Sequence, residues 1–210
     1  MSYIRDNSNQ VFMLADTETE NLALIGKNRP WQIAYIVYQN NKIIDEKERF
    51  IRWDDLDISD EAAKITRFDW AEYKRKWENP KIVLDDFEKY LMDKSIVKLF
   101  HNSHNFDIYI IKNWRESLNL KNDYSYLDDA IDTNALARAI KKGIKKIDRK
   151  NWKTVMFRFA NYVEKGLKTN LKVLGKEFGI QVDYDNLHRG GNDIKLNILV
   201  WEKLKQQIEI

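Results

Sequence analysis

Short apolar runs separated by polar turns mark the first quarter of the chain. Residues 11–15 form an unbroken apolar run of strand length, and residues 31–38 are β-branched and aromatic. A turn at residues 39–41 leads into residues 42–52, which read as a further strand. Runs of this length and composition around a turn predict an antiparallel meander of three strands.

From residue 59 onward the apolar positions change to a helical period. Residues 80–91 place their apolar side chains on one face, as an amphipathic helix does. A fourth strand is predicted at residues 95–100, and a fifth, short strand ends near residue 132. Further helices are predicted at residues 59–77, 108–118, 134–142, 171–178 and 192–208.

Strands followed by interleaved helices predict one α/β domain with a mixed five-stranded sheet flanked by helices. The whole chain, residues 1–210, is expected to form this single domain, because its length suits one core of ordinary size. The core is expected at about residues 11–206, and a less regular, mostly basic insertion at about residues 141–166.

Composition excludes several classes of chemistry. The chain has no Cys, which rules out disulfides, thiolate metal sites and a Cys nucleophile. Its polar first ten residues lack the apolar segment of a signal peptide, and no apolar run is long enough to span a membrane, so a soluble cytoplasmic protein is expected. The net charge of +3 is only weak evidence for a polyanionic partner.

Acidic residues follow the first apolar run directly. If residues 11–15 are a strand, Asp16 and Glu18 leave its end on one face, because a strand has a two-residue period. Carboxylates held so close raise each other's pKa unless a cation lies between them, and Mg2+ binds through such carboxylates. A metal site at the end of a central strand and a solvated acidic turn are both compatible with this stretch.

Three more acids stand at places where local order is expected. Asp107 lies between an aromatic residue and an apolar helical run, where it either belongs to a site or caps the helix. Asp132 has the same two interpretations. His188 precedes Asp193 by five positions, with two glycines between them. A loop imidazole beside an acid suits a general base near neutral pH, although a solvent-exposed loop His is the alternative.

Taken together, three motifs resemble those of a known family. DTE at residues 16–18, HNSHNFD at residues 101–107 and H-x4-D at residues 188–193 are similar, in order and spacing, to the motifs of the DEDDh 3'-5' exonucleases. These are the DnaQ-like members of the ribonuclease H-like superfold. The resemblance covers roughly residues 11–204, and Arg189 stands where the sister class has Tyr. The unusual spacer at residues 189–192 departs from the family pattern and affects the expected site shape.

The resemblance implies a fold and a chemistry. It implies a ribonuclease H-like fold and two divalent metal ions, Mg2+ or Mn2+, held by Asp16, Glu18, Asp107 and Asp193. It makes His188 the base that takes a proton from the attacking water. The expected reaction releases nucleoside 5'-monophosphates from the 3' end of single-stranded DNA or RNA.

Two other functions are compatible with this superfold. A non-catalytic nucleic-acid-binding or polymerase-docking module is expected to lack some of the acids, which are all present here. An endonuclease or integrase of the ribonuclease H type normally lacks the His five positions before the last acid. The sequence leaves open DNA or RNA, monomer or dimer, and whether a polymerase or a replication or repair complex is a partner.

Two groups of residues are expected to contact the substrate. The family resemblance implies that the terminal base and sugar are walled by Leu14, Thr17, Thr19 and Phe106. The densest basic run, residues 141–153, offers lysines that could follow a phosphate backbone, namely Lys141, Lys142, Lys145 and Lys146. A solvated insertion is the alternative interpretation of this run.

Overall fold

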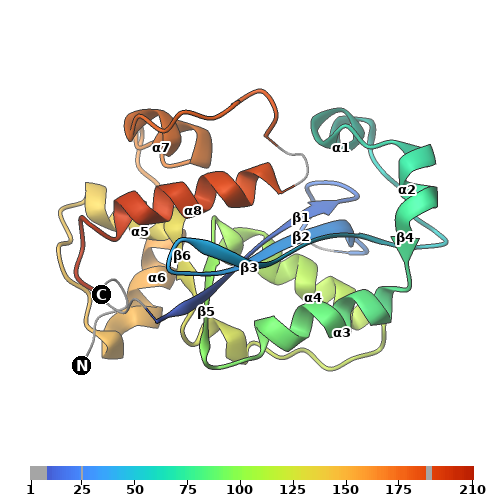
Figure 1. The fold of residues 1–210 in the computed structure, drawn as a ribbon, viewed down its shortest axis with the longest axis horizontal. Coiled ribbons are helices and arrows are strands. Elements are labelled where there is room, and N and C mark those ends of the chain that lie inside the picture. The colour runs from blue at the N-terminus through green and yellow to red at the C-terminus, as the bar shows by residue number, and fades with distance from the viewer. Residues whose placement is uncertain (1–8, 25, 188–190) are drawn as a thin grey trace.

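The computed structural model of the chain describes residues 9–24, 26–187 and 191–210. Its centre is a six-stranded sheet with the strand order β4-β3-β2-β1-β5-β6 (Figure 1). The strands are β1 (Val11–Thr19), β2 (Pro30–Gln39), β3 (Lys42–Ile51), β4 (Trp77–Glu78), β5 (Ile96–Phe100) and β6 (Ile131–Asp132).

The sheet is mixed, as the sequence predicts. Strands β1, β2 and β3 form the antiparallel meander, whereas β5 pairs parallel to β1 and β6 pairs parallel to β5. Since parallel strands end at the same edge of a sheet, the residues that follow β1, β5 and β6 are brought together there. This edge carries the acids that the sequence singles out.

The expected count of five strands is wrong by one, and the predicted helix at residues 59–77 is divided. Helix α1 (Asp60–Thr66) ends at Arg67 in the left-handed conformation, and α2 (Trp70–Lys76) begins after the cap Asp69. The backbone then extends at Trp77, which pairs with Phe50 and makes β4 an edge strand. A periodicity argument misses this two-residue strand because Trp77 falls at the end of the stretch predicted as helix, residues 59–77.

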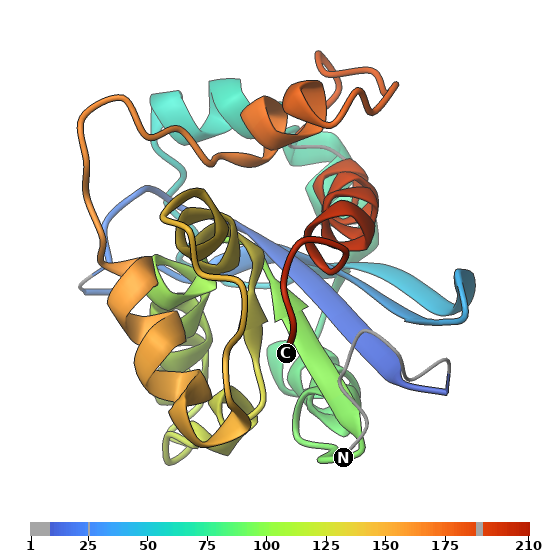
Figure 2. The same ribbon diagram turned by 90° about the vertical axis from the view of Figure 1, so that its left-hand side faces the viewer.

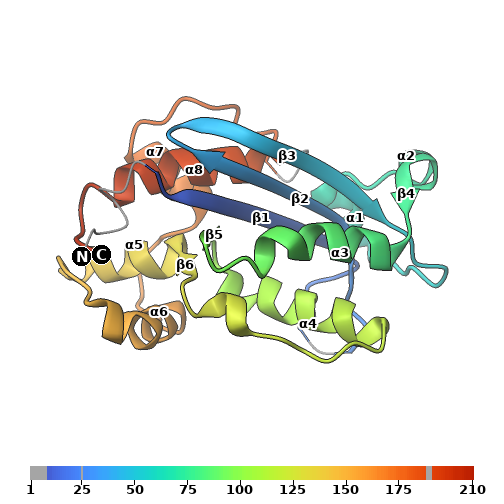
Figure 3. The ribbon, with the colours of Figure 1, turned by 60° about the horizontal axis from the view of Figure 1, so that its bottom comes forward.

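Helices cover both faces of the sheet, as Figures 2 and 3 show. Side chains of β1 alternate between two cores: Phe12 and Leu14 pack on one face, and Met13 packs on the other. Helices α5 (Thr133–Lys141), α6 (Trp152–Ala160), α7 (Leu171–Glu177) and α8 (Asn192–Leu204) supply the first core, and α3 (Pro80–Leu91) and α4 (Asp107–Ser117) supply the second.

The basic insertion is more regular than the sequence suggests. It contains α6, whose Trp152 and Phe159 are buried in the first core, together with Phe12 and Leu14. Trp152 also donates its indole N–H to the carbonyl of Ala130, at 2.8 Å. In the described part of the chain, none of the helices combines the length and apolar character needed to cross a membrane.

Candidate active site

Four carboxylates from three separate segments gather at the edge where β1 and β5 end. Asp16 and Glu18 belong to β1, Asp107 begins α4 after β5, and Asp193 lies in the first turn of α8. Burial raises the pKa of Asp16 well above its ordinary value, and the negative charges of Glu18, Asp107 and Asp193 raise it further. The structure therefore brings these four predicted residues into electrostatic reach of one another.

The pKa values of Glu18 and Asp107 are also raised. Burial, followed by the charges of Asp193 and Asp107, raises the pKa of Glu18 to about 8. Burial also raises the pKa of Asp107 to about 6, against the lowering effect of a hydrogen bond from Thr17. Groups that repel one another in this way favour either protonation or a cation between them.

The donor set fits divalent metal ions of the hard class. Carboxylate oxygens are the ligands that Mg2+ and Mn2+ prefer, and Mg2+ commonly uses one or two of them together with water and substrate phosphate. Among residues 9–24, 26–187 and 191–210, no three acidic or His side chains are drawn closely enough to enclose an ion. The charges of Asp193 and Asp107 raise the pKa of Glu18, so these acids repel one another at their present spacing.

Thr17 and Thr19 use their hydroxyls inside the protein. Thr17 Oγ1 donates to Asp107 Oδ1 at 2.8 Å, and Thr19 Oγ1 donates to the carbonyl of Asn21 at 2.7 Å. Leu14 has no exposed surface and packs in the core, which corrects the expectation that its side chain walls the substrate. Phe106 is half-buried at the start of α4, and its contact with a base stays a prediction.

The predicted general base, His188, lies outside the described residues. Gly191 precedes α8 with a φ of 72°, in the left-handed region that favours glycine. Asp193 follows in the first helical turn and lines the pocket beside Asp16. Gly191 therefore supplies a backbone conformation that other residues rarely adopt, directly before the helix that carries Asp193.

Asp132 is a structural acid beneath the site. Its carboxylate caps α5 by accepting from the backbone N–H groups of Asn134 and Ala135, and it also accepts from the backbone N–H of Asn102 at 2.9 Å. Burial works to raise the pKa of Asp132, but the hydrogen bond from His104 and other partners outweigh it and hold that pKa low. Asp132 thus fixes the loop that leads to Asp107.

A second imidazole, that of His101, is held neutral at physiological pH. Burial lowers the pKa of His101 to about 4. Its Nδ1 lies 2.8 Å from Thr133 Oγ1, which also contacts Asn197 Oδ1 at 2.7 Å. These contacts join the residue that follows β5, the start of α5 and the middle of α8.

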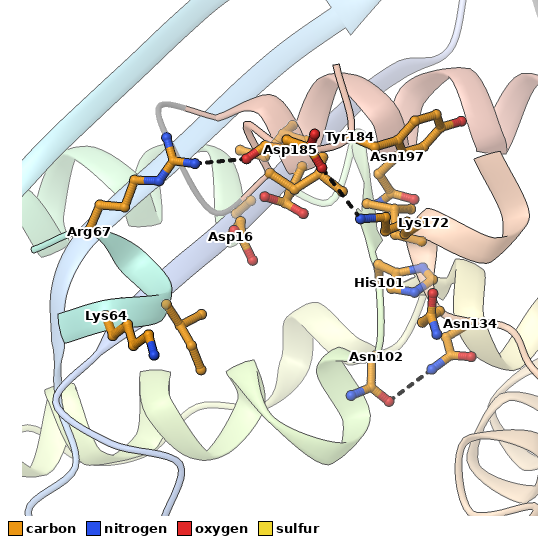
Figure 4. Close-up of a pocket in the computed structure, with 17 residues that line it drawn as sticks. Asp16, Lys64, Arg67, His101, Asn102, Asn134, Lys172, Tyr184, Asp185 and Asn197 are labelled. Atoms are coloured by element: carbon orange, nitrogen blue, oxygen red, sulfur yellow. Dashed lines mark hydrogen bonds and ion pairs between the residues drawn. The ribbon is translucent and has the colours of Figure 1, made fainter. Parts of the chain in front are cut away.

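A cavity of about 820 Å³ opens beside the acids (Figure 4). Asp16 and Asp193 line it together with the polar side chains of Asn102, Asn134 and Asn197. It is also lined by three cations that the sequence does not single out, Lys64, Arg67 and Lys172. No local pattern marks these cations, because the cavity combines segments far apart in the sequence.

The basic run lies away from this cavity. Lys141 pairs with Glu177, Lys142 with Glu164, and Lys146 with Glu209. Residues 145–147 contact the tail at Glu209, beyond the C-terminal end of α8, whereas Asp193 is at its N-terminal end. A helix of 13 residues is ~20 Å long, so Lys145 and Lys146 could meet a substrate only some nucleotides away from the acids. Their contribution to strand binding stays a prediction.

Comparison with known proteins adds a family and a fold. The model of the RNase_T family, described as Exonuclease, matches residues 13–201. No curated protein sequence matches the chain. Two solved structures of E. coli exonuclease I are similar to it, the zinc-bound complex with single-stranded DNA and the complex with a dA16 oligonucleotide, and so is a complex named ExoI/SSB-Ct.

The likeness to these structures extends over almost the whole chain. For the zinc-bound and dA16 complexes the TM-score is 0.72 at 19% identity, over 95% of this chain and 41% of that one. For the ExoI/SSB-Ct complex it is 0.71 at 18% identity, over 95% and 42%. The chain thus spans about two fifths of the length of these proteins. The superposition confirms the expected ribonuclease H-like α/β fold.

Proposed function

Because the chain belongs to the RNase_T exonuclease family, we propose that it shortens single-stranded DNA from the 3' end and releases nucleoside 5'-monophosphates. The expectation of an exonuclease of the DEDDh type agrees with this family. The observation that supports the chemistry best is the gathering of Asp16, Glu18, Asp107 and Asp193 at one edge of the sheet, with the pKa of Asp16 raised by burial and by the charges of the other three.

We propose that these carboxylates hold two Mg2+ or Mn2+ ions. When bound, such a pair stabilises the attacking and leaving oxygens of an in-line displacement at phosphorus. The charges of all three other acids act on Asp16, so this carboxylate would be central to holding the ions. Thr17 fixes the orientation of Asp107 through its hydrogen bond at 2.8 Å.

His188 is the proposed general base. The support is its motif position, five residues before Asp193 on the segment that leads into α8. The described imidazoles are poor candidates, because His101 is buried with a lowered pKa and His104 is bonded to Asp132. His188 would take the proton of the attacking water and leave the acids free to bind cations.

The substrate proposal draws on the similar structures. Exonuclease I of E. coli has been solved with single-stranded DNA and with dA16, and one of these structures is a zinc-bound form. These complexes favour a single DNA strand and a divalent metal for the present chain as well. RNA as a substrate, and a polymerase or repair complex as a partner, stay predictions.

The test uses one oligonucleotide labelled at either end, with Mg2+ and with Mn2+. The 5'-labelled strand is expected to give a ladder of shorter products, and the 3'-labelled strand is expected to give only the labelled mononucleotide. Matched DNA and RNA strands in the same assay determine the sugar preference.

Asp16→Ala is expected to remain folded and to shorten the strand at least about 100-fold more slowly. It removes the acid on which the charges of Glu18, Asp107 and Asp193 all act. Asp54→Ala, a change at an acid whose side chain is 81% exposed, serves as the control and is expected to keep full activity. Internal cuts, or full activity of Asp16→Ala, would contradict the proposal.

A further inference from the structure

The candidate site has cations opposite its acids. Lys64 on α1, Arg67 just after α1 and Lys172 on α7 all line the cavity that Asp16 and Asp193 also line. Figure 4 shows Lys64 and Lys172 on opposite sides of Asp16. One wall of the cavity is formed at α1 and the other at α7, more than a hundred residues later in the sequence. Each wall therefore contributes positive charge.

The three cations differ in what they already bind. Arg67 donates to the carbonyl of Asp185 at 2.9 Å and to Asn186 Oδ1 at 3.1 Å, so its guanidinium ties the two walls together. Lys172 lies 3.9 Å from the carboxylate of Asp185, whose side chain is 95% exposed. Lys64 is exposed and forms no ion pair with any carboxylate in the described ranges.

An apolar side chain lies next to Lys64. Ile65 is 44% exposed and lines the same cavity, so α1 offers both a charge and an apolar surface to whatever enters. A nucleotide upstream of the scissile bond has the matching parts, an anionic phosphate and the apolar face of a sugar or base. In the proposed function the reacting phosphate would be held at the acids through bound metal ions, so these cations are left for the next phosphates along the strand.

Building on the proposed function, we propose that Lys64 and Lys172 bind the backbone phosphates of the nucleotides immediately upstream of the scissile bond, one from each wall. Ile65 packs against the sugar or base between them. The two lysines are substrate-binding residues that bind the phosphates of a single strand, whatever its base sequence. Their place in the cavity lining, beside Asp16 and Asp193, distinguishes them from Lys141, Lys142 and Lys146, which do not line it.

The test measures kinetics and salt dependence on a labelled 12-nucleotide single strand of DNA with Mg2+. Lys64→Met and Lys172→Met remove one charge each from exposed positions, and the double variant removes both. Each single change is expected to raise KM at least about threefold, with kcat within about twofold of the unmodified protein. Each is also expected to reduce the slope of log(kcat/KM) against log[KCl] by about 0.7.

Two controls accompany these variants. Lys94→Met removes an exposed charge before β5, at the end of that strand opposite to the acids, and is expected to leave KM and the salt slope unchanged. Lys64→Arg and Lys172→Arg keep the charge and are expected to restore at least half of the lost salt slope.

The outcomes separate this inference from the proposed function. If the unmodified protein shortens the strand and the double variant has the same KM and salt slope, the role of the two lysines is overturned while the exonuclease stands. If the unmodified protein does not shorten the strand at all, both proposals are overturned. If the double variant loses kcat but keeps KM, the lysines act on the chemical step and the binding role is wrong.

Discussion

The hydroxyl of Thr17 links two of the acid-bearing segments. It belongs to β1, one residue after Asp16, and donates to Asp107 at the start of α4. Thr17 is only 7% exposed, so the bond is shielded from competing water. A buried hydrogen bond to a charged acceptor contributes about 1.5–3 kcal/mol, which is enough to fix the carboxylate in one orientation.

Replacing Thr17 with Val removes this donor at nearly constant volume. We expect kcat on a labelled single strand to fall about tenfold, because Asp107 loses the bond that orients it, while KM changes less than about twofold. Thr17→Ser keeps the hydroxyl and is the matched control, expected to retain most of kcat. Equal loss in both variants would show that the methyl packing, not the donor, matters.

Among the contacts between elements, those of Asp86 connect α3 to the strands β2 and β3. It accepts from Tyr35 Oη at 2.7 Å on β2, and from Lys47 Nζ and Arg49 Nη1, each at 2.8 Å, on β3. Burial works to raise the pKa of Asp86, but the bonds from Lys47 and Tyr35 outweigh it and place that pKa well below its ordinary value. Here α3 is held by charge as well as by its apolar face.

Asp86→Asn is expected to lower the free energy of unfolding by about 2 kcal/mol at pH 7. The pKa of Asp86 is lower in the folded state than in the unfolded state, so its contribution is present above about pH 4 and is lost as the pH falls. Denaturant unfolding at pH 7 and pH 3 measures both. Asp85→Asn, next to it and 53% exposed, is the control and should change stability by less than about 0.5 kcal/mol. An equal loss for Asp86→Asn at both pH values would contradict the explanation.

Elements also show where sequence reasoning succeeds and where it fails. The positions of Asp16 and Asp107 follow from patterns that are local: a strand with a two-residue period and a helix that starts at an acid. Strand β4 and helix α6 depend on tertiary contacts, such as Trp77 pairing with Phe50 and Trp152 entering the core. Local periodicity contains no information about such partners, so these elements could not be predicted.

Across the whole molecule, the site depends on segments from both ends of the chain. Asp16 comes from the first strand and Asp193 from the last helix, and the cavity between them also uses α1 and α7. For the same reason the pocket cations Lys64 and Lys172 had no signal in the sequence. Assembly of like charges from distant segments works against folding unless protons or cations neutralise them.

This arrangement predicts how pH and metal affect stability. The pKa values of Glu18, about 8, and Asp107, about 6, lie above their ordinary values, so both carboxyls bind protons more tightly in the folded protein. The stabilisation from protonation is therefore present at low pH and is lost as the pH rises through these values. We expect the Tm of metal-free protein to fall between pH 5 and pH 8.5.

Added Mg2+ or Mn2+ is expected to raise Tm more at pH 8.5 than at pH 5, because deprotonated carboxylates bind the ions and bound ligand stabilises the folded state. Thermal melts with EDTA and with metal at both pH values measure the difference. Glu18→Gln is the comparison variant and should reduce the pH dependence of the metal-free Tm. A metal-induced rise of equal size at both pH values would contradict the prediction.

The tie from Arg67 to Asp185 and Asn186 has a consequence for turnover. It consists of two hydrogen bonds between exposed groups, which contribute only about 0.5–1.5 kcal/mol each. The span between the two walls can therefore part and re-form on thermal energy alone, without unfolding α1 or α7. In the proposed reaction, this parting is one route by which a mononucleotide would leave the cavity.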